Sequence, residues 1–475
     1  MKVLFVAAEG VPFVKTGGLA DVVGSLPHEL RAIDLEVRVV MPKYQDIPIE
    51  YQEKMQNLTQ FTVPLGWRNQ YCGVEELEHR GVPTYFLDNQ QYFQRPGIYG
   101  YPDDGERFSF FCRAVLEMLP QIDFQPDVIH CHDWHTGMVS TLLQAHYGEV
   151  DFYRNIKTVF TIHNLRYQGT FPKSILGDLL GLDDSYYWFE GVEFHGEVSF
   201  MKAGIVYSDI ITTVSKTYAQ EIQQPYYGER LDGLLQKRKD DLHGIINGID
   251  YQIYNPELDP RIEHPFDRDN MRGKTVNKKK MQHLMNLPID ERIPVVALVT
   301  RLVSQKGLDL VECVLHDIME LPLQFVVLGC GDEHYEKLFS EAAQEYSHKF
   351  AAKILYDEKL AHQIYAGADI FLMPSLFEPC GLGQMIALRY GTLPLVRETG
   401  GLKDTVTSYN EKTGEGNGFS FTNYNAHDML YTLKRAISLY QKNDQWQQLR
   451  IKAMGLDYSW NRSAREYRDV YQIIK

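Results

Sequence analysis

Short apolar runs alternate with longer amphipathic stretches along both halves of the chain, a pattern typical of parallel sheets with crossover helices. In the first half, the runs that predict strands are residues 3–8, 37–41, 84–87, 128–131, 158–162 and 210–214. In the second half they are residues 295–300, 325–328, 353–355, 370–373 and 393–396. The pattern therefore predicts an α/β fold with two doubly wound parallel sheets.

A change in composition separates the two halves. Residues 247–292 are poor in strand signal and rich in Pro, Asn, Asp and charge, and a chain of 475 residues exceeds what one core usually holds. We therefore expect one Rossmann-like domain over residues 1–246 and a second over residues 247–458. The end of the chain, residues 459–475, predicts a helix with Trp460, Ala464, Tyr467 and Tyr471 on one face. This pattern alone leaves open which domain receives the helix.

Composition excludes several classes of function. The net charge of −15 argues against a nucleic-acid partner and against an anionic membrane, because both are bound by basic surfaces. The six cysteines lie far apart and form no Cys-x-x-Cys pair, so they are expected to be buried free thiols. The first apolar run ends at Glu9 after six residues and predicts a strand rather than a signal peptide. No later run approaches the roughly 18 apolar residues of a membrane-spanning helix, so we expect a soluble, cytoplasmic protein.

A glycine pair follows the first predicted strand. Lys15-Thr16-Gly17-Gly18 precedes an amphipathic stretch that begins at Leu19. Paired glycines let a ligand approach the backbone, a helix start offers N–H groups without partners, and a lysine adds charge. The segment resembles a phosphate-binding turn, although it fits neither the dinucleotide fingerprint nor the Walker pattern. A simple tight turn is the alternative reading.

Two cations follow the first strand of the second half. Arg301 comes directly after the predicted strand, and Lys306 lies five residues further on. A guanidinium and an ammonium together suit a diphosphate leaving group, and ligands in open parallel sheets bind beyond the carboxyl ends of the strands. A solvated pair of surface cations is the alternative reading. With the Lys15 segment, these residues predict a nucleotide held from two sides.

The segment Glu378-Pro-Cys-Gly-Leu382 lies between a predicted strand and a helix. Amide groups at the helix start and the preceding carboxylate suit hydrogen bonds with sugar hydroxyls. Glu378 also fits an ordinary acidic residue at a helix N-terminus. The Gly400-Gly401 pair predicts a similar turn, for which the sequence gives weaker evidence of a functional role.

Histidines gather after two strands of the first half. His130, His132 and His135 lie within six residues, and His163 follows the next strand. No partner cluster of Cys or His lies nearby, so we expect no metal. Instead, Asp133 and the imidazoles are expected to line the carboxyl edge of the sheet and contact hydroxyl groups; a purely structural role is the alternative.

Together these motifs resemble those of the bacterial and plant-type glycogen and starch synthases, in the same order across nearly the whole chain. The matching segments are residues 15–21, 132–135, 161–164, 246–250, 301–307 and 378–382. The resemblance implies a GT-B fold, with two Rossmann-like domains facing a deep cleft, and it implies that the helix at residues 459–475 crosses back to the first domain. It also implies retaining transfer of glucose from ADP-glucose to the non-reducing end of an α-1,4-glucan, with neither cofactor nor metal and with oligomers possible. A plant-type source would place the protein in the plastid stroma.

The resemblance also assigns roles to individual residues. For the donor diphosphate, it implies contacts from Lys15 and Gly18 in one domain and from Arg301 and Lys306 in the other, with Gly17 and Asp21 as further substrate-binding residues. For the sugars, it implies that hydroxyls meet Glu378 and the amides of Cys380, Gly381 and Leu382, that Asn247 approaches the glucose, and that Asp133, His163 and Asn164 line the acceptor side. Tyr356 is expected to stack on the adenine.

Three other functions fit parts of the sequence. A sucrose- or trehalose-type GT-B synthase would keep the second-half cations but should lack the Lys15 segment. An NAD-dependent dehydrogenase would need a glycine fingerprint that this chain lacks. A non-catalytic glucan-binding protein would need surface aromatic platforms rather than a diphosphate site, and most of the 30 tyrosines are expected in the core or as ordinary surface residues.

Overall fold

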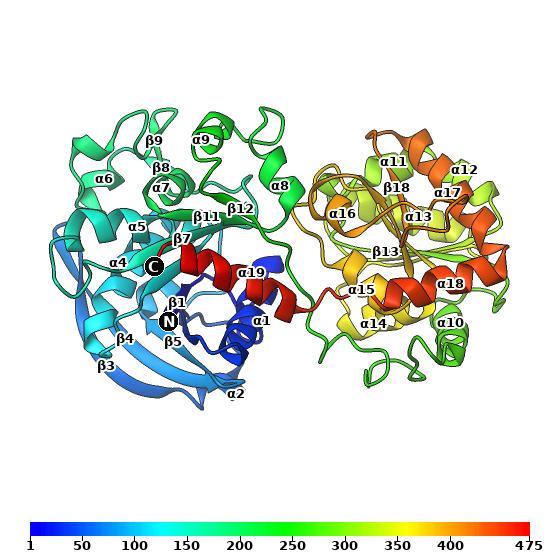
Figure 1. Ribbon diagram of the computed structural model, residues 1–475, viewed down its shortest axis with the longest axis horizontal. Helices are drawn as coiled ribbons and strands as arrows, with labels where there is room; N and C mark the ends of the chain where they lie inside the picture. The colour runs from blue at the N-terminus through cyan, green and yellow to red at the C-terminus, as the bar shows by residue number, and fades with distance from the viewer. The chain divides into compact units, whose positions relative to one another are not determined.

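A computed structural model describes every residue from Met1 to Lys475. The chain forms two compact units, each with its own sheet (Figure 1). The N-terminal unit comprises Met1–Asn247 and Trp460–Lys475, and the C-terminal unit comprises Gly248–Ser459. No helix is long and apolar enough to cross a membrane.

The N-terminal unit contains a nine-stranded sheet of order β12-β11-β7-β6-β1-β2-β5-β4-β3. Its strands are β1 (Lys2–Val6), β2 (Glu36–Pro42), β3 (Gln56–Leu65), β4 (Arg68–His79), β5 (Val82–Asp88), β6 (Val128–His132), β7 (Lys157–Ile162), β11 (Ile210–Thr213) and β12 (Leu242–Gly244). Strands β12 to β5 are parallel. The chain continues from β1 to β2 on one side and reaches β6 on the other. The switch point, where such sheets bind ligands, therefore lies between β1 and β6.

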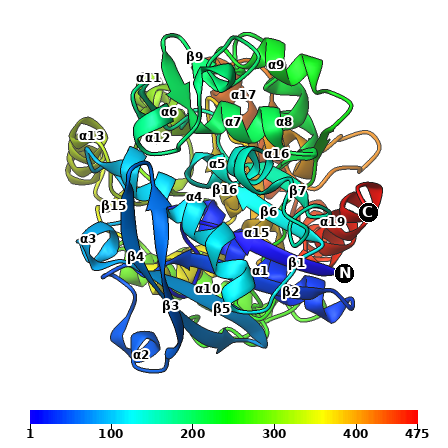
Figure 2. The ribbon, with the colours of Figure 1, turned by 90° about the vertical axis from the view of Figure 1, so that its left-hand side faces the viewer.

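The hairpin β3–β4 extends this sheet in the antiparallel sense beyond β5 (Figure 2). Neither strand was predicted, because most of their residues are at least partly exposed and carry Gln, Asn, Thr and Glu rather than an apolar run. A small second sheet of β8 (Thr170–Pro172), β9 (Glu193–Phe194) and β10 (Glu197–Ser199) was also missed, since its strands are only two or three residues long. The N-terminal sheet is thus mixed, with a parallel centre.

The C-terminal helix α19 (Trp460–Ile473) packs in the N-terminal unit beside α1 (Gly18–Ala32), as Figure 1 shows. The predicted face of this helix is confirmed, because Trp460, Ala464, Tyr467 and Tyr471 are all buried. The other helices of the unit are α2 (Ile49–Gln52), α3 (Gln90–Phe93), α4 (Asp104–Gln121), α5 (Met138–Leu142), α6 (Ile175–Asp178), α7 (Phe200–Tyr207), α8 (Lys216–Glu221) and α9 (Asp232–Lys237).

The C-terminal unit contains a parallel sheet of order β15-β14-β13-β16-β17-β18. Its strands are β13 (Val295–Val299), β14 (Gln324–Leu328), β15 (Phe350–Lys353), β16 (Ile370–Met373), β17 (Leu393–Arg397) and β18 (Phe419–Phe421). The winding reverses between β13 and β16, which places the switch point there. The strand expected at residues 353–355 lies at Phe350–Lys353 instead, two to three residues earlier: Phe350 and Ala351 are buried, whereas Leu355 is 41% exposed. The short β18 was not predicted.

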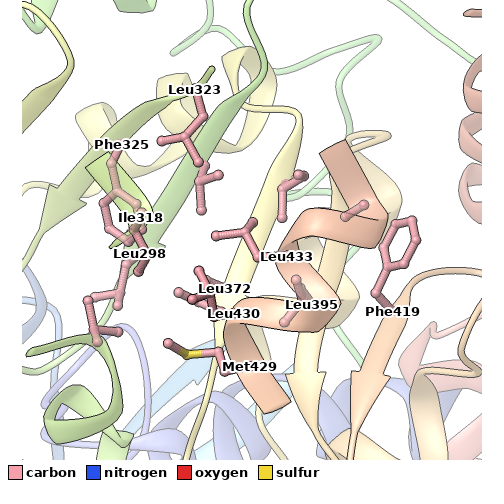
Figure 3. Close-up of a cluster of buried hydrophobic side chains, with 14 of the residues drawn as sticks. Leu298, Ile318, Leu323, Phe325, Leu372, Leu395, Phe419, Met429, Leu430 and Leu433 are labelled. Atoms are coloured by element: carbon pink, nitrogen blue, oxygen red, sulfur yellow. The ribbon is translucent and has the colours of Figure 1, made fainter. Parts of the chain in front are cut away.

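The core of the C-terminal unit lies between this sheet and its helices. In Figure 3, Met429, Leu430 and Leu433 of α17 (Ala426–Tyr440) face side chains of the strands, including Leu372 and Leu395. These side chains are at most 6% exposed, so their burial holds the strand ends in fixed positions. The other helices are α10 (Arg272–Leu284), α11 (Leu308–Cys313), α12 (Leu315–Glu320), α13 (Glu333–Glu345), α14 (Glu358–Gly367), α15 (Gly383–Arg389), α16 (Gly400–Thr405) and α18 (Asn443–Met454).

Candidate active site

The loop after β1 is held by Glu9, a residue that the sequence analysis did not single out. Glu9 is 3% exposed, and its Oε2 accepts hydrogen bonds from the backbone N of Thr16 at 2.5 Å and from its hydroxyl at 2.9 Å. Burial raises the pKa of Glu9, while the bonds from Thr16 oppose that rise. The signal available in the sequence was an acidic residue, Glu9, at the end of the first apolar run. Glu9 therefore fixes the segment that carries Lys15.

Lys15 itself extends toward α1. Its Nζ lies 2.7 Å from Oδ1 of Asp21 in the first turn of that helix, and the two side chains are 40% and 21% exposed. The N-cap residue Gly17 offers no side chain to cap the helix, so the first N–H groups of α1 are available to an anion.

Packing does not explain the glycine pair. A Cβ on Gly18 would meet no atom within 4 Å, and a Cβ on Gly17 would meet only Glu9 Oε1 at 4.0 Å. Neither residue has a positive φ. The protein itself therefore tolerates a side chain at both positions, and the open space in front of α1 is of the kind that a ligand fills.

Asp133 follows β6 in a backbone conformation that few residues other than glycine adopt, with φ 57° and ψ 178°. Its Oδ1 accepts hydrogen bonds from the backbone N of His163 at 2.8 Å and of Asn164 at 3.4 Å, just after β7. Burial raises the pKa of Asp133 to about 7, and the nearby Glu9 adds to the rise. The structure thus brings Asp133, His163 and Asn164 together next to the switch point.

The histidines at the ends of β6 and β7, His130, His132 and His163, are buried and neutral. His132 Nδ1 lies 3.0 Å from His163 Nε2, and burial lowers the pKa of His163 to about 3. His130 bonds Thr161 Oγ1 at 2.6 Å and the hydroxyl of Tyr471 at 2.7 Å, which ties α19 to β6. No group of three or more His, Cys, Asp or Glu side chains is arranged to hold a metal ion. The histidines therefore support the carboxyl ends of these strands through hydrogen bonds rather than through charge.

Asn247 lies beyond β12, four strands along the sheet from β1. It is 5% exposed, and its Oδ1 has no hydrogen-bond partner. A buried amide oxygen without a donor is uncommon and marks a place where a ligand hydroxyl or water is expected.

In the C-terminal unit, the strand ends at the switch point bring Lys306 and Glu378 together. Lys306 Nζ lies 2.7 Å from Glu378 Oε2, which also accepts a 3.1 Å hydrogen bond from the hydroxyl of Ser375. The Lys306 and Glu378 side chains are 15% and 9% exposed, whereas Arg301 just after β13 is exposed. Ser375, which lies in the loop after β16, was not predicted from the sequence.

Glycines allow the backbone to approach these residues closely. Gly307 has φ +70°, and a Cβ there would lie 2.1 Å from Pro374 O, so the turn after Lys306 requires glycine. Similarly, a Cβ on Gly400 would lie 2.0 Å from Glu378 O, and Gly401 N donates to that carbonyl at 3.2 Å. The Gly400-Gly401 pair therefore supports the Glu378 segment.

The residues after Glu378 lead into α15. Cys380 is buried, Gly381 has φ +72°, and Leu382 is the N-cap of the helix without a side-chain hydrogen bond. Their amides thus lie at a helix start. Tyr356 is placed differently: it follows β15, two strands from β13, and is 77% exposed.

Comparison with known proteins identifies the family of the chain. Residues 2–237 match the family model of the starch synthase catalytic domain, and residues 282–452 match that of glycosyl transferases group 1. A glycogen synthase from Desulforamulus reducens is 59% identical over 472 residues, covering 99% of this chain and 98% of the relative. This chain belongs to the glycogen synthase family.

Other relatives extend the match. A glycogen synthase from Geobacillus thermodenitrificans is also 59% identical and covers 100% of this chain and 98% of its own. The solved catalytic domain of starch synthase IV from Arabidopsis thaliana, bound to ADP and acarbose, is 36% identical with a TM-score of 0.93, covering 99% of both chains. A sucrose-phosphate synthase from Thermosynechococcus elongatus is 15% identical with a TM-score of 0.63 over 100% of this chain and 98% of that one, which shows the fold alone.

Membership of the glycogen synthase family confirms the predicted GT-B fold and the predicted class of enzyme. As a glycogen synthase family member, the chain is a glucosyltransferase of glycogen synthesis. Its two sheets carry the clusters described above at the carboxyl ends of their strands.

Proposed function

We propose that this enzyme transfers glucose from ADP-glucose to the non-reducing end of an α-1,4-glucan with retention of configuration. The observation that carries the proposal is the Lys306–Glu378 pair at the switch point of the C-terminal sheet, which joins a cation suited to phosphate with a carboxylate suited to sugar hydroxyls. The starch synthase IV relative, which binds ADP, supports adenine as the base of the donor.

Charge neutralisation of the leaving diphosphate is assigned to Arg301 and Lys306, with Lys15 and the start of α1 acting on the same group. Cations and helix N–H groups stabilise charge that develops as the sugar–phosphate bond breaks. Four positive or partly positive groups supply what a divalent ion supplies in other transferases. We therefore propose a metal-independent reaction.

The glucose is assigned to Glu378 and the amides of Cys380, Gly381 and Leu382. Because Lys306 and Ser375 both occupy Oε2 of Glu378, a sugar hydroxyl would meet Oε1. Gly401, through its bond to the Glu378 carbonyl, holds this segment in place. Asn247, with its unpartnered amide oxygen, is assigned to the same sugar, and Tyr356 to the adenine ring.

The acceptor is assigned to Asp133, His163 and Asn164. A double displacement would need an ionised carboxylate as nucleophile. Asp133 suits that role poorly, because its Oδ1 accepts two backbone hydrogen bonds and its pKa of about 7 leaves it partly protonated. It suits a hydrogen bond with an acceptor hydroxyl. We propose front-face attack, in which the departing phosphate oxygen takes the proton of that hydroxyl.

The products test this proposal. The enzyme should extend a maltooligosaccharide with ADP-glucose equally well with and without EDTA. β-Amylase, which cuts α-1,4 bonds from the non-reducing end, should remove all the added glucose. Resistance to β-amylase, loss of turnover in EDTA, or a glucosylated Asp133 peptide after rapid quenching would each contradict it.

A further inference from the structure

A polar cavity lies in the C-terminal unit beside the amino ends of the central strands, at the opposite end of the sheet from Lys306 and Glu378. Asp369, directly before β16, accepts a 2.8 Å hydrogen bond from the backbone N of Val295, where β13 begins. The cavity beside it has a volume of about 520 Å³ and is lined mainly by residues of α10 and α18. Because β13 and β16 begin here and end near Arg301 and Glu378, the length of the sheet separates the cavity from the candidate active site.

The buried wall of this cavity carries more positive than negative charge. Lys278 Nζ lies 2.8 Å from one oxygen of Asp369, and Arg450 bonds the other, so two cations share one carboxylate. A third basic side chain, that of Lys274, donates to three backbone carbonyls and the hydroxyl of Thr392. Burial, with a smaller contribution from the neighbouring Arg450, lowers the pKa of Lys274 well below its usual range, so the positive charge of the wall rests on Lys278 and Arg450.

Two further charged residues line the cavity and do not offset this excess. The carboxylate of Glu291 pairs with Lys279 at 3.1 Å, and Arg292 pairs with Asp290 at 2.9 Å. The net field on the cavity is therefore positive.

Helix α18 begins at the cavity and adds N–H donors. Its N-cap residue Lys442 provides no side-chain cap, and the first helical residue, Asn443, lines the cavity. Trp446 and Arg450, one turn apart on this helix, also line it and are 1% and 7% exposed. The Nε1–H of Trp446 and the Nε–H of Arg450 have no hydrogen-bond acceptor. Buried donors without acceptors are costly, so the wall around the cavity holds hydrogen-bonding groups that its own residues leave unsatisfied.

We propose that this cavity binds a small phosphate monoester that carries hydroxyl groups. The phosphate would lie at the start of α18 near Lys278 and Arg450, where the helix dipole and the positive excess both favour an anion. Phosphate alone is much smaller than the cavity. The amides of Asn443 and Gln447 and the ring of Tyr440 suit the hydroxylated remainder of the ligand.

Calorimetry with glycerol 3-phosphate tests this site in the full-length protein. The Lys306→Ala background weakens binding at the candidate active site, so the remaining binding reports on the cavity. Gln447→Glu places a negative charge on the cavity wall and should raise the Kd about tenfold or more. Gln448→Glu is the matched control, because Gln448 is the exposed neighbour on the same helix and does not line the cavity.

The expected result is one site per chain, weakened by Gln447→Glu and unchanged by Gln448→Glu. Inorganic phosphate should compete for it with a higher Kd. Absence of binding in the Lys306→Ala background would overturn the proposal, as would the same Kd in both glutamate variants. If Gln447→Glu does not fold, Asn443→Asp adds the same charge at a helix start, where an acidic residue is tolerated, and should weaken binding equally.

Discussion

Lys306 Nζ lies 2.7 Å from Glu378 Oε2, and this ion pair links the loops after two neighbouring strands at the switch point of the C-terminal sheet. With 15% and 9% of their side chains exposed, the two groups hold each other in position while remaining within reach of a substrate. The pair therefore joins the site assigned to the diphosphate with the site assigned to the glucose.

Replacing Lys306 tests the phosphate role. Lys306→Ala should lower kcat/KM by roughly a hundredfold or more, because a charged contact to the leaving group contributes about 2–4 kcal/mol to transition-state stabilisation. Steady-state kinetics with ADP-glucose measure the change. Lys337→Ala, at a lysine with 73% of its side chain exposed on α13, is the control and should keep wild-type kinetics. Near-normal turnover in Lys306→Ala would contradict the phosphate role.

Gly18 offers a test in which stability and activity should separate. Gly18→Ala should fold with an unchanged or slightly higher Tm, because its Cβ meets no protein atom and alanine favours helix. It should nevertheless raise KM for ADP-glucose about tenfold or more, since the methyl group occupies space assigned to the diphosphate. Gly233→Ala, which also has open space around its Cβ in α9, is the matched control for stability. Unchanged kinetics in Gly18→Ala would show that the space in front of α1 is not used.

The bond between Thr16 and Glu9 should matter for donor binding. Thr16→Val keeps the size of the side chain and removes the hydroxyl that donates to the buried carboxylate, a loss of about 1–3 kcal/mol. We expect kcat/KM for ADP-glucose to fall about tenfold as the Lys15 loop loosens. Thr16→Ser keeps the donor and should restore most of the activity. Equal loss in both variants would mean that the methyl group, not the hydrogen bond, holds the loop.

Asp133 should make stability depend on pH in a defined direction. Its pKa in the folded protein, about 7, exceeds its ordinary value of 3.8, so the folded state binds the proton more tightly than the unfolded state. Its contribution to stability is present at low pH and is lost as the pH rises toward about 7. In the Asp133→Asn variant the side chain does not titrate, so this loss of stability with rising pH is absent. The Tm of the variant minus that of the wild type should therefore increase by about 5 °C from pH 5 to pH 8. A constant difference would contradict the raised pKa.

Much of this architecture could be predicted from local patterns. Ten of the eleven predicted strands lie within two residues of their observed ends, because buried parallel strands give continuous apolar runs. Residues at the ends of such strands, including Asp133, His163 and Glu378, are then brought to one edge of each sheet by the topology. The exposed hairpin β3–β4 gave no such signal.

Other features depend on contacts that no local pattern reveals. His130 bonds Tyr471 across 341 residues of sequence, and Ser375 contacts Glu378 only because the loop after β16 turns back. The sequence places Glu9 at the end of the first apolar run but does not reveal its bonds with Thr16. The side chains that support the candidate site were therefore harder to predict than those assigned to the substrate.

The most direct test of the proposed chemistry is transfer of radiolabelled glucose to glycogen from ADP-glucose and from UDP-glucose, measured side by side. We predict rapid incorporation from ADP-glucose, much slower incorporation from UDP-glucose, and loss of the ADP-glucose signal in Lys306→Ala. Incorporation from UDP-glucose at an equal or higher rate, or no incorporation from either donor by the folded wild-type enzyme, would contradict it.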